Sequence, residues 1–153
     1  MKIALFGANG DSGKEIMNSL LERGHKVVAA VRRPDTVTPT ESVKVRMVDL
    51  NDMSSIEQAI DGCQVVISAI GSGKLVAASK PTTIYSQGTK SIGIAMRNKG
   101  IKRLIVLSSS GLEYDEYHGY IYFCCFRRYL INTYIDMARM EGMLEEWKDD
   151  DIE

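Results

Sequence analysis

The stretch Ile3-Ala4-Leu5-Phe6-Gly7-Ala8-Asn9-Gly10-Asp11-Ser12-Gly13 decides the fold of this chain of 153 residues. An apolar run of strand length leads into a loop with a glycine at every third position. A segment of helical period follows, in which Ile16 and Leu20 lie on one face, and Gly24 is placed to end that helix. A strand, a glycine loop and a helix in this order predict the opening of an α/β domain.

Apolar runs and helical segments continue to alternate along the rest of the chain. Near-continuous β-branched residues are typical of parallel strands that are buried on both faces. Further strands are expected over residues 27–31, 43–48, 65–70 and 104–107, and helices over 12–23, 54–62, 84–100 and 126–147. Ser54 and Glu57 have the spacing of a capping box at the start of the second helix. We therefore expect a single domain over residues 1–153, a doubly wound parallel sheet of about five strands with helices on both faces.

Composition excludes several functional classes. With 19 Lys+Arg against 20 Asp+Glu the net charge is -1, so no overall field attracts nucleic acid. The aromatic-rich apolar run of residues 121–126 is far shorter than the ~20 residues that span a bilayer, and the N-terminus lacks the pattern of a signal peptide. Cys63, Cys124 and Cys125 have no metal-ligand spacing. We expect a cytoplasmic protein with reduced thiols, no metal, no membrane partner and no nucleic-acid partner.

The glycine loop has the chemistry of a diphosphate site. Its glycines permit a tight turn, a close approach of backbone N–H groups to a ligand, and close packing of the helix on the strand. The positive end of the helix then faces the phosphates. The alternative is an ordinary turn in which Ser12 and Glu15 form a capping box. The position between a first strand and a first helix favours dinucleotide binding.

The end of the second strand indicates which dinucleotide is preferred. An NAD site usually has an acidic residue here, which accepts hydrogen bonds from the adenosine ribose. This strand instead ends in Val31-Arg32-Arg33-Pro34, and a guanidinium suits a 2'-phosphate. The alternative is that Arg32 and Arg33 are solvated surface charges. We predict NADP(H) as the cofactor.

The chain resembles the atypical short-chain dehydrogenases, and among them the biliverdin-IXβ reductase or flavin reductase branch; the NmrA-like proteins are similar but more distant. The motifs that carry the resemblance are Val48-Asp49-Leu50, Ala69-Ile70-Gly71, Pro81-Thr82-Thr83-x-x-Ser86-x-Gly88 and Ala95-Met96-x-x-x-Gly100. The resemblance implies phosphate contacts from Gly7, Asn9, Gly10, Asp11, Ser12 and Gly13, a 2'-phosphate contact from Arg32, adenine contacts from Asp49 and Leu50, ribose contacts from Ala69, Ile70 and Gly71, and catalytic residues Ser109 and Ser110 near the reacting ring.

The classical proton-transfer pair of the superfamily, Tyr-x-x-x-Lys, does not occur in this sequence. Hydride addition to a simple carbonyl leaves an alkoxide that needs a positioned acid, whereas a flavin or a linear tetrapyrrole delocalises the added charge. The first hypothesis is therefore an NADPH-dependent reductase of flavins or related planar acceptors. The second is a non-catalytic NADP(H)-binding redox sensor of the NmrA-like kind. The aromatic cluster between Tyr114 and Phe126 is either a lid over a planar substrate or a packed entrance to the last helix.

The resembling proteins continue into a sixth strand, and this sequence stops at Glu153, near the start of that strand. A sheet that ends early has an unpaired edge, and such an edge invites pairing with another chain. We expect a monomer, or a dimer formed through the exposed sheet edge.

Overall fold

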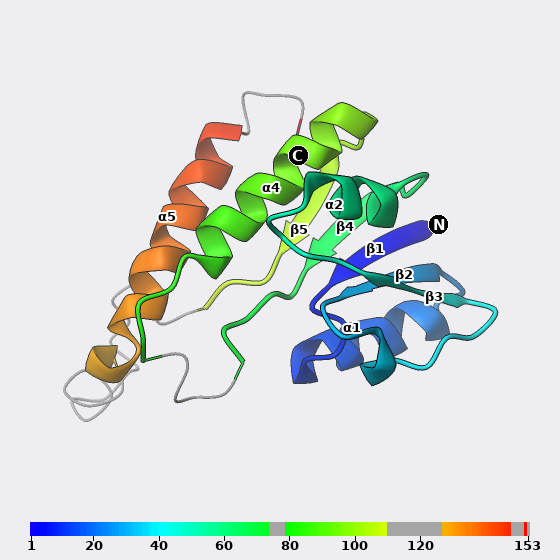
Figure 1. Cartoon of the computed structure of the whole chain (residues 1–153), viewed down its shortest axis with the longest axis horizontal. Helices are drawn as coiled ribbons and strands as arrows, with labels where there is room; N and C mark the ends of the chain where they lie inside the picture. The colour runs from blue at the N-terminus through cyan, green and yellow to red at the C-terminus, as the bar shows by residue number, and fades with distance from the viewer. Residues whose placement is uncertain (74–78, 110–126, 148–151, 153) are drawn as a thin grey trace.

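A parallel sheet forms the centre of the computed structural model, which describes residues 1–73, 79–109, 127–147 and 152 (Figure 1). Its strand order is β3-β2-β1-β4-β5. All four neighbouring pairs run parallel, with Ile3 opposite both Val27 and Val65. The strands are β1 (Lys2–Phe6), β2 (Lys26–Val31), β3 (Val43–Met47), β4 (Val65–Ser68) and β5 (Arg103–Val106). The predicted doubly wound sheet is confirmed.

Helices cover both faces of the sheet. They are α1 (Asp11–Glu22), the short 3-10 helix η1 (Pro34–Thr36), α2 (Met53–Ile60), α4 (Ile84–Lys99) and α5 (Ile131–Trp147). Helix α1 lies on one face, and α2, α4 and α5 lie on the other side (Figure 1). None of the helices in the described ranges is long and apolar enough to span a bilayer.

The alternation of side chains along β1 divides the interior into two layers. Ile3 and Leu5 pack toward Ile16 and Leu20 of α1. Ala4 and Phe6 face the opposite layer, which contains residues of α2, α4 and α5. Leu5 is 0% exposed and Phe6 is 2% exposed. Burial of such side chains contributes roughly 1.5–3 kcal/mol each, so β1 anchors the glycine loop that follows it.

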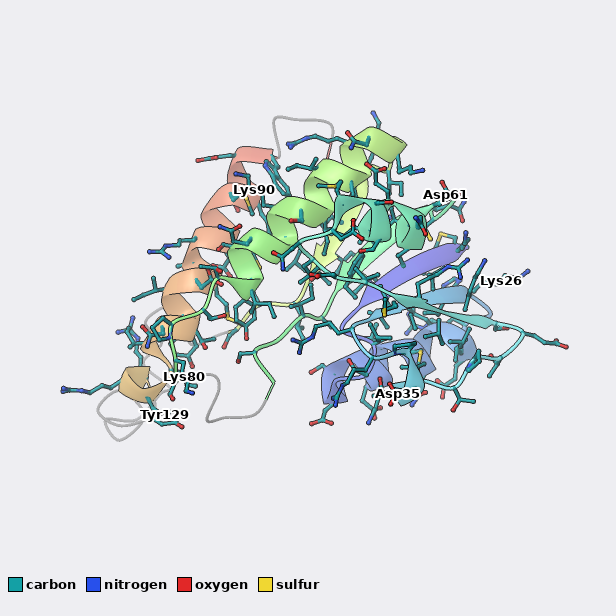
Figure 2. The ribbon with its side chains drawn as sticks, viewed as in Figure 1. Lys26, Asp35, Asp61, Lys80, Lys90 and Tyr129 are labelled. Atoms are coloured by element: carbon teal, nitrogen blue, oxygen red, sulfur yellow. The ribbon has the colours of Figure 1, made fainter. Side chains whose placement is uncertain are left out.

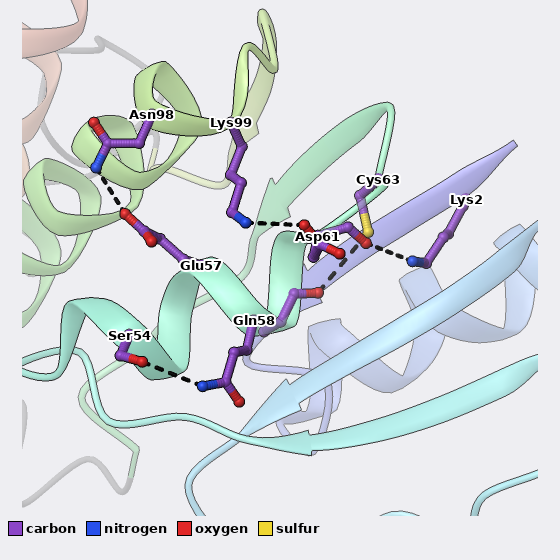
Figure 3. Close-up of polar contacts among 9 residues, drawn as sticks. Lys2, Ser54, Glu57, Gln58, Asp61, Cys63, Asn98 and Lys99 are labelled. Atoms are coloured by element: carbon purple, nitrogen blue, oxygen red, sulfur yellow. Dashed lines mark hydrogen bonds and ion pairs between the residues drawn. The ribbon is translucent and has the colours of Figure 1, made fainter.

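Close contacts join the helices of the larger layer. Gly93 of α4 lies so near Trp147 of α5 that a Cβ atom at Gly93 would overlap the indole. The Arg97 guanidinium lies 4.9 Å from the centroid of the same ring. Polar contacts tie α4 to α2 as well, since Asn98 donates to Glu57 (2.7 Å) and Lys99 pairs with Asp61 (2.9 Å) (Figure 3). These contacts fix the position of α4, whose first turn borders the cleft described below.

Several element ends differ from the predictions. Strand β4 ends at Ser68, before residue 70, and helix α5 begins at Ile131 rather than near residue 126. The predicted cap of α2 is wrong, because the helix already includes Ser54 and the side chain of Asp52 accepts from the Ser54 N–H (3.0 Å). Asp52 is extended at φ -106° and ψ 100°, as an N-cap residue must be.

The outer surface carries dispersed charge. Lys26, Asp35 and Asp61 are exposed on different elements (Figure 2). Strand β5 lies at one edge of the sheet, where Ile105 is 47% exposed and Leu107 is 45% exposed. A dimer formed through this edge stays a prediction.

Candidate functional site

A cleft of about 510 Å³ runs along the carboxyl ends of β2, β1, β4 and β5. Its volume is in the range of pockets that hold small molecules and cofactors. The sequence order of the strands reverses between β1 and β4, and ligands of open α/β sheets bind at such a switch point. Three strand intervals separate the ends of β2 and β5, so the cleft spans roughly 14 Å across the sheet.

The cleft brings together most of the residues that the sequence predicted to bind cofactor. Those that line it are Gly7, Asn9, Gly10, Asp11, Ser12, Gly13, Arg32, Arg33, Leu50, Ala69, Ile70 and Gly71. Asp49 and Ser109 are not among the lining residues, and Ser110 lies outside the described ranges, as does the aromatic cluster between Tyr114 and Phe126. The structure thus groups the predicted diphosphate, ribose and 2'-phosphate contacts along one continuous surface.

The structure requires glycine at some positions of the loop and not at others. Gly7 has φ +76°, and a Cβ atom there would overlap the Ala69 carbonyl. A Cβ atom at Gly13 would overlap the carbonyl of Gly7. The packing of the protein itself therefore requires glycine at positions 7 and 13. At Gly10 the nearest atom to such a Cβ is the Gly7 oxygen at 3.4 Å, an ordinary contact. The fold therefore does not require glycine at position 10. The absence of a side chain at this position leaves space in the cleft for a ligand.

Helix α1 opens directly into the cleft. Its N-cap is Gly10 (φ -74°, ψ 165°), and within the described residues no side chain caps it. The N–H of Lys14 makes the first intrahelical bond, to the Gly10 carbonyl at 2.9 Å, so the N–H groups of residues 11–13 precede the helical ladder. The alternative of a capping box is wrong, since Ser12 and Glu15 both lie inside the helix. An uncapped positive end beside a glycine without a side chain fits a diphosphate.

Arg32 and Arg33 border the cleft where β2 ends, and both are exposed. A guanidinium donates several hydrogen bonds and accepts none, which suits a phosphate rather than a ribose hydroxyl pair. Asp49, beyond β3, is exposed and used elsewhere: its Oδ1 accepts from the Asn51 N–H (2.9 Å) and Nδ2 (3.1 Å). Its carboxylate therefore stabilises the turn that leads into α2.

The other end of the cleft is mainly apolar, and its lining residues were not predicted from the sequence. Ile84, Leu107 and Met137 line it together with two hydroxyl groups. The hydroxyl of Tyr85 accepts from the Ser72 N–H (3.1 Å) and donates to Ser72 Oγ (3.5 Å). The hydroxyl of Ser108 donates to Oε1 of Glu141. Both hydroxyl protons are thus engaged within the protein.

A buried carboxylate supports this end from behind. Asp136 of α5 is 0% exposed. Its Oδ2 accepts from the backbone N–H of Tyr85 (2.9 Å) and of Ser86 (3.4 Å), and its Oδ1 accepts from the Ser86 hydroxyl. The first turn of α4, and with it the Tyr85 side chain, is therefore held by α5.

The described residues do not form a metal site, because nowhere among them do three His, Cys, Asp or Glu side chains gather. Cys63 is buried, and burial raises the pKa of its thiol above the usual value. A thiol that stays protonated is a poor nucleophile. The chemistry of the cleft thus depends on backbone N–H groups, guanidinium groups and oriented hydroxyls.

Comparisons with known proteins agree with this geometry. A family model described as NAD(P)H-binding matches residues 7–149. Cinnamoyl-CoA reductase 1 of Arabidopsis thaliana is 31% identical over 128 residues, which cover 73% of this chain and 35% of that protein. The chain therefore spans about a third of the length of this relative.

Solved structures share the fold over nearly the whole chain. The oxidoreductase ylbE from Lactococcus lactis has a TM-score of 0.71 at 23% identity, covering 94% of this chain and 63% of that one. A short-chain dehydrogenase/reductase from Veillonella parvula, solved in complex with NADP, has a TM-score of 0.72 at 22% identity, covering 95% and 64%. At these identities the likeness establishes the architecture.

Proposed function

Because this chain belongs to the NAD(P)H-binding family of Rossmann-fold proteins, we propose that it is an NADPH-dependent reductase that passes hydride directly to a planar conjugated acceptor. The acceptor class is a flavin or a related molecule such as a linear tetrapyrrole. The similarity to cinnamoyl-CoA reductase 1 at 31% identity supports a redox role. The acceptor class rests on the cleft itself.

The observation that carries the proposal is the contrast between the two ends of the cleft. The α1 end offers uncapped N–H groups and two arginines, Arg32 and Arg33, for an anionic dinucleotide. The far end is apolar, and its described hydroxyls, Tyr85 and Ser108, direct their protons to Ser72 and Glu141. An acceptor that spreads the charge of an added hydride does not need a strong acid beside it, and solvent supplies the proton.

Each part of the cleft has a task in this reaction. The N–H groups of residues 11–13 bind the diphosphate, and Arg32 and Arg33 bind the 2'-phosphate. Residues 69–71 line the cleft beyond the end of β4 and would contact the ribose when NADPH is bound. Ile84, Leu107 and Met137 provide an apolar surface for a flat ring and exclude water from it. NADPH, when bound, supplies the hydride.

The direct test is the absorbance of NADPH after addition of riboflavin, FMN or biliverdin to the purified protein. Consumption of NADPH that depends on the acceptor and saturates with it is the expected result. Calorimetry on the same sample gives the affinity for NADPH independently. Tight binding of NADPH without any consumption would contradict the reductase and favour a redox-sensing protein of the NmrA-like kind.

Arg32→Ala tests the cofactor preference. Loss of a charge-assisted hydrogen bond costs about 1.5–3 kcal/mol, so the affinity for NADPH should fall about 10- to 100-fold. The affinity for NADH, which has no 2'-phosphate, should change by less than about threefold. Arg46→Ala removes an exposed charge from β3 outside the cleft and is the matched control. Equal losses for NADPH and NADH in calorimetry would refute the role of Arg32.

A further inference from the structure

The hydroxyl of Ser108 is held in one orientation. Ser108 lines the cleft just beyond β5, and Glu141 lies on α5; both are partly buried. The Ser108 hydroxyl donates to Oε1 of Glu141. A serine has a single hydroxyl proton and a carboxylate accepts without donating. The proton of Ser108 is therefore directed to α5, which leaves Oγ to act as an acceptor toward the cleft.

The surroundings make this acceptor significant. The neighbouring lining residues Ile84, Leu107 and Met137 offer a ligand no strong hydrogen-bond partner. The Tyr85 hydroxyl already accepts from the Ser72 N–H and donates to Ser72 Oγ. Within the described part of the apolar end, Ser108 Oγ is thus the acceptor best placed to meet a polar edge of a bound ring. A site built around a fixed acceptor discriminates strongly against ligands that lack the matching donor.

We propose that Glu141 fixes Ser108 as a hydrogen-bond acceptor, and that the reductase thereby selects planar acceptors with an N–H group at the ring edge. This inference rests on the proposed function and narrows its substrate class. The flavin imide and the pyrrole rings of tetrapyrroles carry such N–H groups. The polar groups of a simple quinone are carbonyl oxygens, which accept hydrogen bonds and cannot donate one to Oγ. Glu141 acts here as a positioning residue, since it reaches the ligand only through Ser108.

Lumiflavin and 3-methyllumiflavin test the proposal, because they differ by one methyl group that replaces the imide hydrogen. In the unaltered protein the KM for lumiflavin should be about 3- to 10-fold lower than that for the methylated form, as expected for one hydrogen bond. In Ser108→Ala the ratio of the two KM values should fall to about one, through a rise in the KM for lumiflavin. The affinity for NADPH, measured by calorimetry, should change by less than about threefold, because most of its predicted contacts lie at the α1 end of the cleft.

Glu141→Gln tests the positioning step without removing Ser108. The glutamine keeps one acceptor oxygen but can also turn its NH₂ group to donate to Oγ, so Ser108 is no longer confined to one orientation and the preference for lumiflavin should weaken. Glu146→Gln, which alters an exposed carboxylate on the same helix, is the matched control and should keep the preference. Circular dichroism and the melting temperature establish that the variants are folded.

Distinct outcomes would overturn the inference. Equal KM values for lumiflavin and 3-methyllumiflavin in the unaltered protein would contradict the proposed hydrogen bond. A Ser108→Ala variant that loses NADPH affinity but keeps the flavin preference would show that Ser108 contacts the cofactor. Loss of the preference in Ser109→Ala but not in Ser108→Ala would assign the role to Ser109. If no flavin is reduced, the proposed function fails, and quenching of flavin fluorescence in the presence of NADP⁺ still measures the same affinity ratio.

Discussion

Helices α1, α2 and α4 all begin at the carboxyl edge of the sheet, and their first turns are satisfied in different ways. The first turn of α2 receives the carboxylate of Asp52. That of α4 receives the carboxylate of Asp136, which comes from α5. Helix α1 has only Gly10 at its cap position and no side-chain acceptor from the described residues.

This difference distinguishes structural helix ends, whose N–H groups bind a carboxylate of the protein, from a binding end, whose N–H groups face the cleft. Every helix start leaves N–H groups without an intrahelical partner and carries a partial positive charge. A built-in carboxylate satisfies those groups permanently, which stabilises the fold. At α1 the corresponding position faces the cleft, so the same groups remain for the anionic part of a ligand. The three helix ends therefore predict three different responses to substitution.

Gly10→Asp should have the largest effect, because it gives α1 the kind of cap that the other helices have. Position 10 has the extended backbone of an N-cap and space for a Cβ atom, so the free protein should be as stable as the original or slightly more stable. A carboxylate about 4 Å from a phosphate is repelled by roughly 4 kcal/mol at an effective dielectric constant of ~20. We expect the affinity for NADPH in calorimetry to fall by at least about 100-fold.

Gly10→Ala and Gly10→Asn separate the causes of that loss. Alanine adds the Cβ atom without an acceptor, and asparagine adds a cap without a charge. Affinities should decrease in the order alanine, asparagine, aspartate. An aspartate variant that binds NADPH as well as the unaltered protein would show that α1 does not hold the diphosphate.

Asp136→Ala should have the next largest effect, and on stability rather than on affinity for the diphosphate. It leaves the buried N–H of Tyr85 and the hydroxyl of Ser86 without their acceptor. Unsatisfied buried groups cost about 1–3 kcal/mol each, so the free energy of unfolding should fall by about 3 kcal/mol in urea denaturation. Asp136→Asn keeps one acceptor oxygen and should lose less. Equal losses in both variants would mean that the charge, not the hydrogen bonding, matters.

The sequence predicted the fold well because the fold depends on local patterns. Alternating residues of β1 and the glycine loop are sufficient to place a strand before a helix, and Gly7 and Gly13 are dictated by contacts within that same unit and with the neighbouring strand end. The ends of elements were less predictable. Whether Asp52 or Ser54 caps α2 depends on which residue has extended backbone angles, and a capping-box pattern does not contain that information.

The two ends of the cleft likewise differ in how far the sequence could predict them. The α1 end is made of short-range motifs and was recognised from them. At the far end, Asp136 lies 51 residues from Tyr85, and Glu141 lies 33 residues from Ser108, so no local pattern connects the partners. One signal was present: side chains of β5 alternate, and Leu104 and Val106 pack toward the α4 and α5 side, which places Ser108 there and Ser109 opposite.

Asp52→Ala should have the smallest effect of the three. It removes the acceptor for the Ser54 N–H in an exposed first turn, where loss of an N-cap costs about 1 kcal/mol. Water can replace part of that hydrogen bond, which it cannot do at the buried Asp136. Asp52 does not line the cleft, so the affinity for NADPH should be unchanged, and Asp52→Asn should restore most of the stability. If Asp52→Ala weakened NADPH binding as much as Gly10→Asp does, the separation between structural and binding helix ends would fail, because a capped helix would then also belong to the site.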